Sequence, residues 1–369
     1  MAPTPLQQLA ERGQSVWIDY LSRKFVKDGD LKGLVDKGVV GVTSNPTIFQ
    51  AAIAEGDAYD EQIKELSAEH DDPREIFWLL AKDDIRDACD VLRPVWDEGR
   101  GKDGWVSLEV DPSVAHDTEA TTREARRLHD LVDRPNLFVK IPATEAGLKA
   151  IEDSIADGIP INVTLIFSLE RHRKVAEAYI RGVKRFVDNG GDPTGALASV
   201  ASFFVSRVDT EADKRLDEIG GHDELKGKLA IANAKLAYQT YEEVFSSPEW
   251  QELEAKGASK QRCLWASTST KNPDYRDVLY VEELVGPDTV NTMPRETVEA
   301  VLDHGEIRGD TIKEGVDEAS RILDAFEAAG VKYDEVVQVL EDEGVQKFEK
   351  SFDDLIAGLD SKLKSLVAA

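Results

Sequence analysis

The sequence has little cysteine, little positive charge and no long apolar run, and each shortage excludes a class of protein. Only Cys89 and Cys263 occur in 369 residues. Two cysteines are too few for a disulfide framework and indicate a reducing compartment. Lys and Arg number 45 against 72 Asp and Glu, so the net charge is -27 and repels nucleic acids and anionic membrane surfaces. No stretch reaches the roughly 18 consecutive apolar residues of a membrane-spanning helix.

The composition otherwise indicates a folded protein that binds small molecules. Hydrophobic residues make up 41% of the chain and the mean hydropathy is -0.37, which is too apolar for disorder despite 32% charged residues. The opening MAPTPLQQLAERG has neither a basic region nor an apolar core of a secretion signal. We therefore expect a cytoplasmic protein. Despite the negative net charge, it could bind a small anionic metabolite as its partner, because such a ligand needs only a local cluster of cations. The oligomeric state is left open.

Short β-rich runs alternate with helical patterns along the whole chain. The eight predicted strands are SVWIDY (15–20), VVGVTSN (39–45), WVSLEVDP (105–112), LFVKIPA (137–143), INVTLIF (161–167), ASVASFFVS (198–206), CLWAST (263–268) and TVNTMP (289–294). Strand followed by helix, eight times, predicts a closed (β/α)8 TIM barrel, whereas length alone would also allow two domains. An open doubly wound sheet normally has a glycine-rich phosphate loop after its first strand, and SVWIDYLSR contains none.

Helical periodicity fills the segments between and after these strands. The apolar faces are Val175, Tyr179, Val183 and Phe186 after the fifth strand, Leu225, Leu229, Ala232 and Leu236 after the sixth, Ile85, Cys89, Leu92 and Trp96 within 47–102, and Ile312, Val316, Ala319, Leu323, Phe326, Val345, Phe348, Phe352 and Leu355 near the end. The long segment 47–102 predicts extra helices at the barrel rim. No linker or repeat divides the chain, so we expect one domain over 1–369 with capping helices at about 310–369.

Polar side chains interrupt seven of the strands near their ends, although buried parallel strands are normally apolar throughout. These residues are Asp19, Asn45, Glu109, Lys140, Asn162, Thr164, Ser202 and Ser267. The carboxyl ends of barrel strands converge on one face, where active sites form. We therefore expect these side chains to share one small volume.

Lys140 is the most unusual of these residues. In LFVKIPA, strict alternation surrounds its ammonium with apolar neighbours on either face. Desolvation favours the neutral amine of a lysine, and that amine is the nucleophile that forms a Schiff base with a carbonyl substrate. An edge-strand lysine that prevents aggregation is the alternative.

Asp19 and Glu109 reach the same predicted face and would make a catalytic cluster with Lys140. Two structural alternatives remain: Asp19 could cap the next helix, and Glu109 could lie on a solvated strand face with Ser107 and Asp111. The carboxylates could also bind Mg²⁺. We expect no metal site, and the histidines fall away from the strand ends, which leaves no imidazole for a transition metal. They are His70, His116, His129, His172, His222 and His304.

Other polar residues near the strand ends are candidates for substrate binding. Asn45 in TSNPTIF predicts an Asx turn closed by Pro46 at the start of a helix, whether or not Asn45 also contacts ligand. After the sixth and seventh strands, hydroxyls and cations could bind a phosphate. They are Ser202, Arg207, Ser267 and Lys271. Ordinary surface Arg and Lys are the alternative explanation.

The segments GVTSNPTIF, VSLEVDP, LFVKIPATEAG, INVTLIFS and ASVASFFVSRVD together resemble transaldolase, the Schiff-base enzyme of the non-oxidative pentose phosphate pathway. The motifs occur in order over almost the whole chain. The length and WASTSTKNPDY resemble the longer bacterial form. One position departs from the family: Ser269 stands where many transaldolases have an Arg, and Lys271 is the candidate replacement.

This resemblance implies a TIM barrel, a transferase activity and no cofactor. It implies Lys140 as the Schiff-base lysine, Asp19 as an acid/base and Glu109 as a second carboxylate. It further implies that Asn45, Asn162, Thr164 and Ser202 bind substrate hydroxyls or the catalytic water and that Arg207 and Ser267 bind phosphate. The implied reaction moves a three-carbon unit between sugar phosphates.

Two rival functions remain open. Fructose 6-phosphate aldolase is a related barrel that cleaves without transfer, but its members are shorter and lack the Glu matched by Glu109. A binding or scaffold barrel without catalysis would need Lys140 to behave as an ordinary lysine. Phe204 beside Ser202 would act in a transferase as an apolar shield against water.

Overall fold

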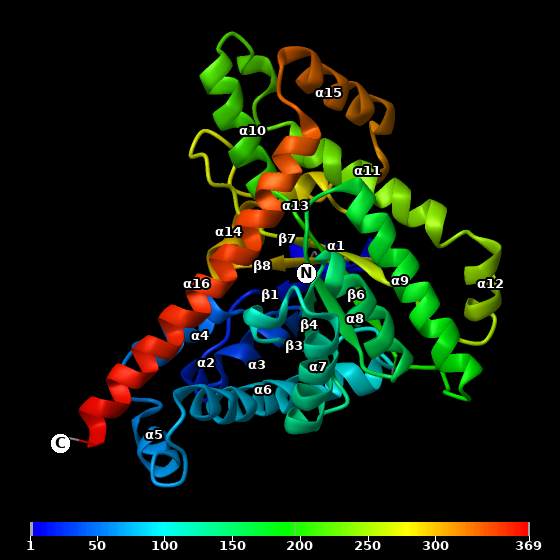
Figure 1. The fold of residues 1–369 in the computed structure, drawn as a ribbon. Coiled ribbons are helices and arrows are strands. Elements are labelled where there is room, and N and C mark those ends of the chain that lie inside the picture. Colours follow the sequence, from blue (N-terminus) through cyan, green and yellow to red (C-terminus); the bar gives the residue numbers. More distant parts are fainter. Residues whose placement is uncertain (1–2, 196, 368–369) are drawn as a thin grey trace.

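The computed structural model describes residues 3–195 and 197–367, and at its centre is a closed parallel barrel (Figure 1). Its strands are β1 (Gln14–Ile18), β2 (Val39–Val42), β3 (Trp105–Glu109), β4 (Leu137–Pro142), β5 (Ile161–Ile166), β6 (Ser199–Phe204), β7 (Arg262–Ala266) and β8 (Thr289–Met293). Consecutive strands pair in parallel, and β8 pairs with β1 to close the ring. The predicted TIM barrel is confirmed, and the open doubly wound sheet is excluded because that sheet does not close.

Each strand starts within one residue of its predicted start but ends one to three residues sooner. The backbone leaves the sheet early because it must turn into the next loop or helix. Asn45 lies beyond β2 and caps the following helix, and Ser267 lies beyond β7 with a left-handed φ of 57°. Asp19, Asn45 and Ser267 therefore follow their strands, whereas the other predicted strand-end residues lie within them.

Helices surround the barrel and extend beyond it. In the described residues they are α1 (Pro5–Glu11), α2 (Arg23–Lys27), α3 (Asp30–Val35), α4 (Pro46–Ala54), α5 (Asp60–Leu66), α6 (Pro73–Glu98), α7 (Thr118–Val132), α8 (Glu145–Ala156), α9 (Leu169–Asp188), α10 (Ser206–Ile219), α11 (Leu229–Val244), α12 (Pro248–Glu254), α13 (Leu279–Glu283), α14 (Arg295–His304), α15 (Val316–Ala329) and α16 (Tyr333–Val367). Short 3₁₀ turns are η1 (Pro112–Val114), η2 (Asp223–Leu225) and η3 (Thr311–Lys313). Helices α4, α5 and α6 are the extra helices predicted for segment 47–102.

Two predicted helix faces are partly wrong. Ile312 belongs to η3, whereas Val316, Ala319, Leu323 and Phe326 lie on α15, which begins after Gly315 with φ of 66°. The face after the sixth strand is broken in the same way. Leu229 and Ala232 lie buried on α11, but Leu225 belongs to η2 and not to that helix. Gly227, with φ of 71°, interrupts the backbone between them. A left-handed residue ends helical periodicity even where the apolar spacing continues.

Aromatic side chains fill the barrel interior toward the amino ends of the strands. Trp17 of β1 and Phe138 of β4 lie 6.1 Å apart between ring centroids, although these strands are not neighbours, so the contact crosses the interior. Trp105 stacks on Phe138 at 4.1 Å. Gly41 makes room for Trp17, because a Cβ there would lie 2.5 Å from the indole ring. This packing fills the barrel interior below the carboxyl ends of the strands.

The C-terminal helix α16 crosses the molecule as one long rod (Figure 1). It packs against α4 and α6. Phe352 of α16 meets Phe77 of α6 edge to face at 5.5 Å and also lies against Trp78. These buried contacts hold the middle of α16 in place beside the barrel.

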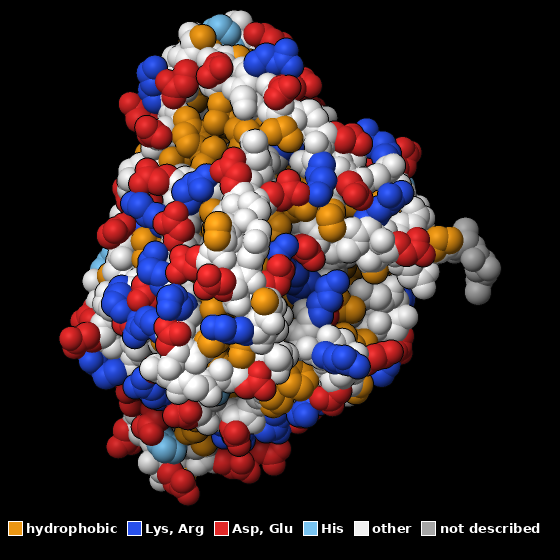
Figure 2. All heavy atoms as spheres, turned by 90° about the vertical axis from the view of Figure 1, so that its right-hand side faces the viewer, with side chains coloured by type: hydrophobic (Ala, Val, Ile, Leu, Met, Phe, Trp, Pro, Cys, Tyr) orange, Lys and Arg blue, Asp and Glu red, His pale blue; other side chains and the backbone are white. Residues whose placement is uncertain are grey.

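The surface carries mixed charge despite the acidic composition. Figure 2 shows Asp and Glu side chains interspersed with Lys and Arg on the face that it presents. Charged residues of the chain also form exposed pairs at helical spacing, such as Lys184 with Asp188 in α9, and such pairs contribute little to stability. Among the described residues, no helix is both long and apolar enough to cross a membrane.

Candidate active site

A cavity of about 180 Å³ lies at the carboxyl ends of the barrel strands. Eight of the ten residues predicted for the site line it: Asp19, Asn45, Lys140, Thr164, Ser202, Arg207, Ser267 and Lys271. The remaining two, Glu109 and Asn162, are buried and contact the lining residues Lys140 and Ser202. The structure thus brings all ten side chains into one neighbourhood.

Lys140 lies in β4 and is buried, with 5% of its surface exposed. Its Nζ donates a hydrogen bond to the Ser44 carbonyl at 3.3 Å and lies 3.3 Å from Glu109 Oε2. The edge-strand alternative is wrong, because β4 pairs with β3 on one side and β5 on the other. An amine in this position is desolvated, faces the cavity and has a carboxyl group within reach.

Glu109 ends β3 directly opposite Lys140 in the strand register. Burial raises its pKa to about 7, and the nearby Lys140 ammonium only partly offsets that rise. The solvated-face alternative is wrong, because both Ser107 and Glu109 are buried. Oε2 accepts no hydrogen bond from the described residues. A carboxyl group with this pKa can both donate and accept a proton near neutral pH.

Asp19 is half-buried at the cavity wall. Its carboxylate accepts a hydrogen bond from the Thr43 hydroxyl at 2.7 Å, and Thr43 in turn meets the Thr292 hydroxyl at 2.7 Å. The helix-cap alternative is wrong, because Ser22 caps α2. The Thr43 hydroxyl thus holds Asp19 Oδ1, and Oδ2 makes no hydrogen bond within the described residues.

A short hydrogen-bond chain crosses β3, β5 and β6 beneath the cavity. Asn162 donates to Ser107 Oγ at 3.0 Å and accepts from Ser202 Oγ at 2.7 Å. Asn162 therefore reaches the cavity through Ser202, which it orients. Thr164 lines the cavity, and its buried Oγ1 has no partner among the described residues, so it is free to bind a ligand.

Cations and hydroxyls form the outer part of the cavity. Burial lowers the pKa of Arg207, whose guanidinium lies 4.8 Å from the centre of the Phe204 ring. Ser267 Oγ lies 2.8 Å from Ser206 Oγ, and Lys271 Nζ donates to Ser269 Oγ at 2.8 Å. Lys271 thus lies beside the serine that departs from the family pattern.

Comparison with known proteins shows the family of the chain. Residues 16–359 match the transaldolase/fructose-6-phosphate aldolase family. The chain belongs to this family. It is 53% identical to Transaldolase 2 of Streptomyces coelicolor over 98% of both chains. It is also 55% identical to the transaldolase of Acidothermus cellulolyticus, over 98% of this chain and 97% of that one, and 52% identical to the transaldolase of Mycobacterium tuberculosis over 95% of each.

The resemblance inferred from the ordered motifs is therefore confirmed, and the chain is a transferase of the transaldolase type. Among the described residues, no three His, Cys, Asp or Glu side chains are grouped so that they could hold a metal ion.

Six lining residues were not singled out from the sequence: Thr43, Ala266, Thr292, Pro294, Glu296 and Phe348. Thr43 and Thr292 follow the same rule as the predicted residues, since both are polar and lie at strand ends, so the signal was available. Phe348 of α16 is different: it lines the cavity, and Lys140 Nζ lies 5.6 Å from the centre of its ring. Helical periodicity indicated only that Phe348 lies on a buried face of its helix. No local pattern shows which part of the barrel that face covers.

Proposed function

We propose that this transferase moves a three-carbon dihydroxyacetone unit from a ketose phosphate to an aldose phosphate through a Schiff base on Lys140. The donor is sedoheptulose 7-phosphate or fructose 6-phosphate, and the acceptor is erythrose 4-phosphate or glyceraldehyde 3-phosphate. The observation that carries the proposal is the buried Lys140 amine facing the cavity, 3.3 Å from a carboxyl group whose pKa is about 7. This places the chain in the non-oxidative pentose phosphate pathway.

Glu109 supplies the proton that imine formation requires. The Lys140 amine attacks the ketone carbon and gives a carbinolamine, whose hydroxyl leaves only as water. Protonated Glu109 gives that hydroxyl a proton, directly or through a water molecule, and the C–O bond breaks to leave an iminium. Glu109 takes a proton back when the iminium is hydrolysed at the end of the cycle.

Asp19 handles the proton of carbon–carbon bond cleavage. Its Oδ2 atom removes the proton from the hydroxyl on the fourth carbon, which becomes an aldehyde as the bond between the third and fourth carbons breaks. The electron pair moves into the iminium and gives an enamine on Lys140, and the aldose phosphate leaves. The acceptor aldehyde then adds to the enamine by the reverse steps, with its new hydroxyl protonated by Asp19.

The remaining lining residues bind the substrate. Arg207, Ser267 and Lys271 form the phosphate site, with Lys271 in place of the arginine that Ser269 replaces. Asn45, Thr164 and Ser202 bind substrate hydroxyls or the water that leaves, and Asn162 orients Ser202. The iminium is the electron sink of this reaction, so the proposal includes no metal and no organic cofactor.

Borohydride trapping combined with a transfer assay tests the function. We expect the protein, reduced in the presence of fructose 6-phosphate, to gain the mass of a three-carbon adduct on Lys140. We also expect about one equivalent of glyceraldehyde 3-phosphate per protein without acceptor, and continued release only when erythrose 4-phosphate is added as acceptor. Release of free dihydroxyacetone at the same rate without acceptor would identify an aldolase, and absence of any adduct would favour a binding protein.

The raised pKa of Glu109 predicts how imine formation depends on pH. Since the protonated carboxyl acts, the rate should fall as pH rises through about 7. Glu109→Gln should lose that inflection and slow imine formation by about 10²–10⁴-fold. The measurement is single-turnover trapping between pH 5.5 and 8.5, with Glu98→Gln at the exposed end of α6 as the control. An unchanged inflection in Glu109→Gln would assign the proton to another group.

The position of Phe348 leads us to expect that α16 protects the enamine intermediate from water. The Phe348 ring lies over Lys140 and, with Phe204, would keep water from the enamine. Phe348→Ala should still form the adduct but release dihydroxyacetone severalfold faster relative to transfer. Phe348→Leu keeps the apolar bulk and loses only the cation–π contact, so its ratio of release to transfer should stay near that of the parent. An unchanged ratio in Phe348→Ala would show that the ring does not shield the intermediate.

Three broader features belong to the same proposal. Cys89 and Cys263 are both unpaired and buried, which supports a cytoplasmic location. The net charge of -27 supports small sugar phosphates rather than nucleic acid as partners. The packing of α16 against α4 and α6 supports a single domain over residues 1–369, of which 1, 2, 196, 368 and 369 lie outside the described part.

A further inference from the structure

A second cavity, of about 420 Å³, opens at the opposite end of the barrel. Trp105, Ser199 and Arg262, which line it, are the first residues of β3, β6 and β7. The cavity therefore lies at the amino ends of the strands, and the layer of Trp17, Trp105 and Phe138 separates it from the site around Lys140. Nothing in the transfer reaction uses this end of the barrel.

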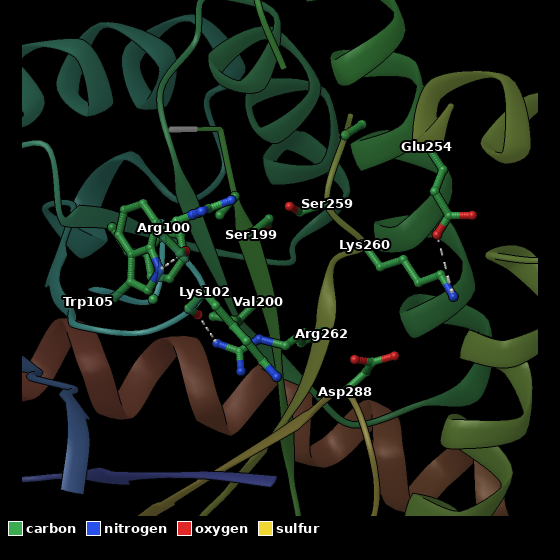
Figure 3. A pocket seen from close by; sticks show the side chains of 15 residues that line it. Arg100, Lys102, Trp105, Ser199, Val200, Glu254, Ser259, Lys260, Arg262 and Asp288 are labelled. Carbon is green, nitrogen blue, oxygen red and sulfur yellow. Dashed lines mark hydrogen bonds and ion pairs between the residues drawn. The ribbon is translucent and has the colours of Figure 1, made fainter. Parts of the chain in front are cut away.

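Cations gather around this second cavity although the chain as a whole is strongly acidic. Its walls carry four cations, Arg100, Lys102, Lys260 and Arg262, against two acidic residues, Glu254 and Asp288. In Figure 3 the Arg100 side chain extends toward Ser199, Lys260 turns toward Glu254 on the far wall, and Arg262 is directed toward Lys102. An excess of positive charge inside a concave wall favours an anionic ligand.

Arg262 is the structural member of this group. It is buried and donates to Ser15 Oγ at 2.8 Å and to the Lys102 carbonyl at 2.5 Å, and it pairs with Asp103 at 3.0 Å. Asp103 also accepts a hydrogen bond from Ser15 at 2.8 Å. The charge of Arg262 is thus compensated, and its bonds position the loop that carries Lys102.

The side chains of the other three cations have no strong hydrogen-bond or ion-pair partner among the described residues. Within residues 3–195 and 197–367, the side chains of Arg100 and Lys102 make no hydrogen bond or ion pair, and both are exposed. Lys260 lies 3.8 Å from Glu254, a partly exposed pair that solvent weakens. These side chains can therefore turn to a bound anion without breaking a strong interaction.

The backbone at Arg100 gives an independent reason to assign it a binding role. Arg100 has φ of 51° between Gly99 and Gly101, a left-handed conformation that favours glycine. Gly101 also comes so close to the Gly195 carbonyl that a Cβ would clash. The loop is thus held close to Gly195. An arginine in this strained conformation has a backbone cost, and the feature of its side chain that could offset that cost is the guanidinium, which can bind an anion.

We propose that this cavity binds a small phosphorylated metabolite with at least two negative charges, held by Arg100, Lys102 and Lys260. The volume is within the range of small-molecule sites and exceeds that of the cavity around Lys140. The hydroxyls of Ser199 and Ser259 line the same space, and Val200 and Ala258 offer apolar surface to the carbon part of the ligand. This site is distinct from the phosphate site proposed for the substrate.

Titration with inorganic pyrophosphate at constant ionic strength tests the proposal. We expect saturable binding by calorimetry and a rise in melting temperature. The double variant Arg100→Ala/Lys102→Ala should raise the Kd at least about tenfold, because each charge-assisted hydrogen bond to an anion contributes about one order of magnitude in affinity. Both residues are exposed, so the variant should fold and keep its transfer activity.

Two comparison variants locate the bound anion. Arg123→Ala/Lys174→Ala removes the same charge from exposed positions on α7 and α9 and should leave the Kd unchanged. Arg207→Ala alters the substrate site and should also leave it unchanged. The proposal fails if pyrophosphate binding is not saturable or if the two double variants weaken binding equally. It also fails if Arg207→Ala abolishes binding while Arg100→Ala/Lys102→Ala does not.

Discussion

Lys140→Met is expected to remove all transfer activity and all borohydride-trapped adduct while leaving a folded barrel. Methionine fills nearly the same space but has no amine, so no imine can form. Removal of one partner from a buried ion pair normally destabilises a protein, because the other charge is left uncompensated. Here the loss of stability is limited. Lys140 lowers the pKa of Glu109, so in Lys140→Met the pKa of Glu109 should rise above 7. The buried carboxyl group then stays protonated and carries no uncompensated charge.

Intact-mass measurement after reduction with fructose 6-phosphate checks the adduct, and thermal melting checks the fold. Lys149→Met is the matched control, since Lys149 lies on α8 with about half of its side chain exposed. The control should form the adduct as the parent does. An adduct on another lysine in Lys140→Met would overturn the assignment of the nucleophile.

Asp19→Asn is expected to stop the reaction one step later. An amide keeps the shape of the carboxylate and still accepts the hydrogen bond from Thr43, but it cannot take the proton from the substrate hydroxyl. Loss of a general base typically slows a step by about 10²–10⁴-fold. Imine formation, which depends on Glu109, should then outpace cleavage, and the trapped adduct should carry the whole ketose skeleton.

Mass measurement distinguishes the whole ketose adduct from the three-carbon adduct. Thr43→Val serves as the comparison, because it removes the hydroxyl that holds Asp19 but leaves the base in place. It should slow cleavage less than Asp19→Asn and still give the three-carbon adduct. If Asp19→Asn gives only the three-carbon adduct, cleavage proceeds without this carboxylate and its proposed role is wrong.

The two carboxylates are suited to different steps because their surroundings differ. Glu109 is buried against Lys140 with a raised pKa, whereas Asp19 is half-buried and held by the Thr43 hydroxyl. A pair of acidic groups in contrasting environments commonly divides acid and base roles. The pH profile of Glu109→Gln and the adduct mass of Asp19→Asn therefore test two separate assignments.

Much of the fold could be predicted because its signals are local. Parallel strands buried on both faces are short apolar runs, and each run in this chain is bounded by turn residues and followed by a helical period. The strand ends were less predictable. Asn45 and Ser267 look continuous with their strands in sequence, but helix capping and a left-handed turn take the backbone out of the sheet before them.

The inner part of the site was also predictable from local anomalies. Lys140, Asn162 and Ser202 each place a polar side chain in an apolar run, and the convergence of strand ends in a barrel predicts that they meet. Thr43 and Thr292 obey the same rule and could have been included. The sequence could not distinguish an edge-strand lysine from a buried one, because that depends on which strands flank β4.

The sequence by itself determined the eight strand and helix units, the family and the polar residues that face the carboxyl end of the barrel. Only the tertiary structure decided that Glu109 lies 3.3 Å from Lys140, that Phe348 covers that amine and that Arg100 and Lys260 share a cavity. Strands and helices form from interactions between residues near in sequence, so their patterns are legible in the chain. Contacts between distant segments depend on barrel closure and on where α16 packs, and no local pattern records either.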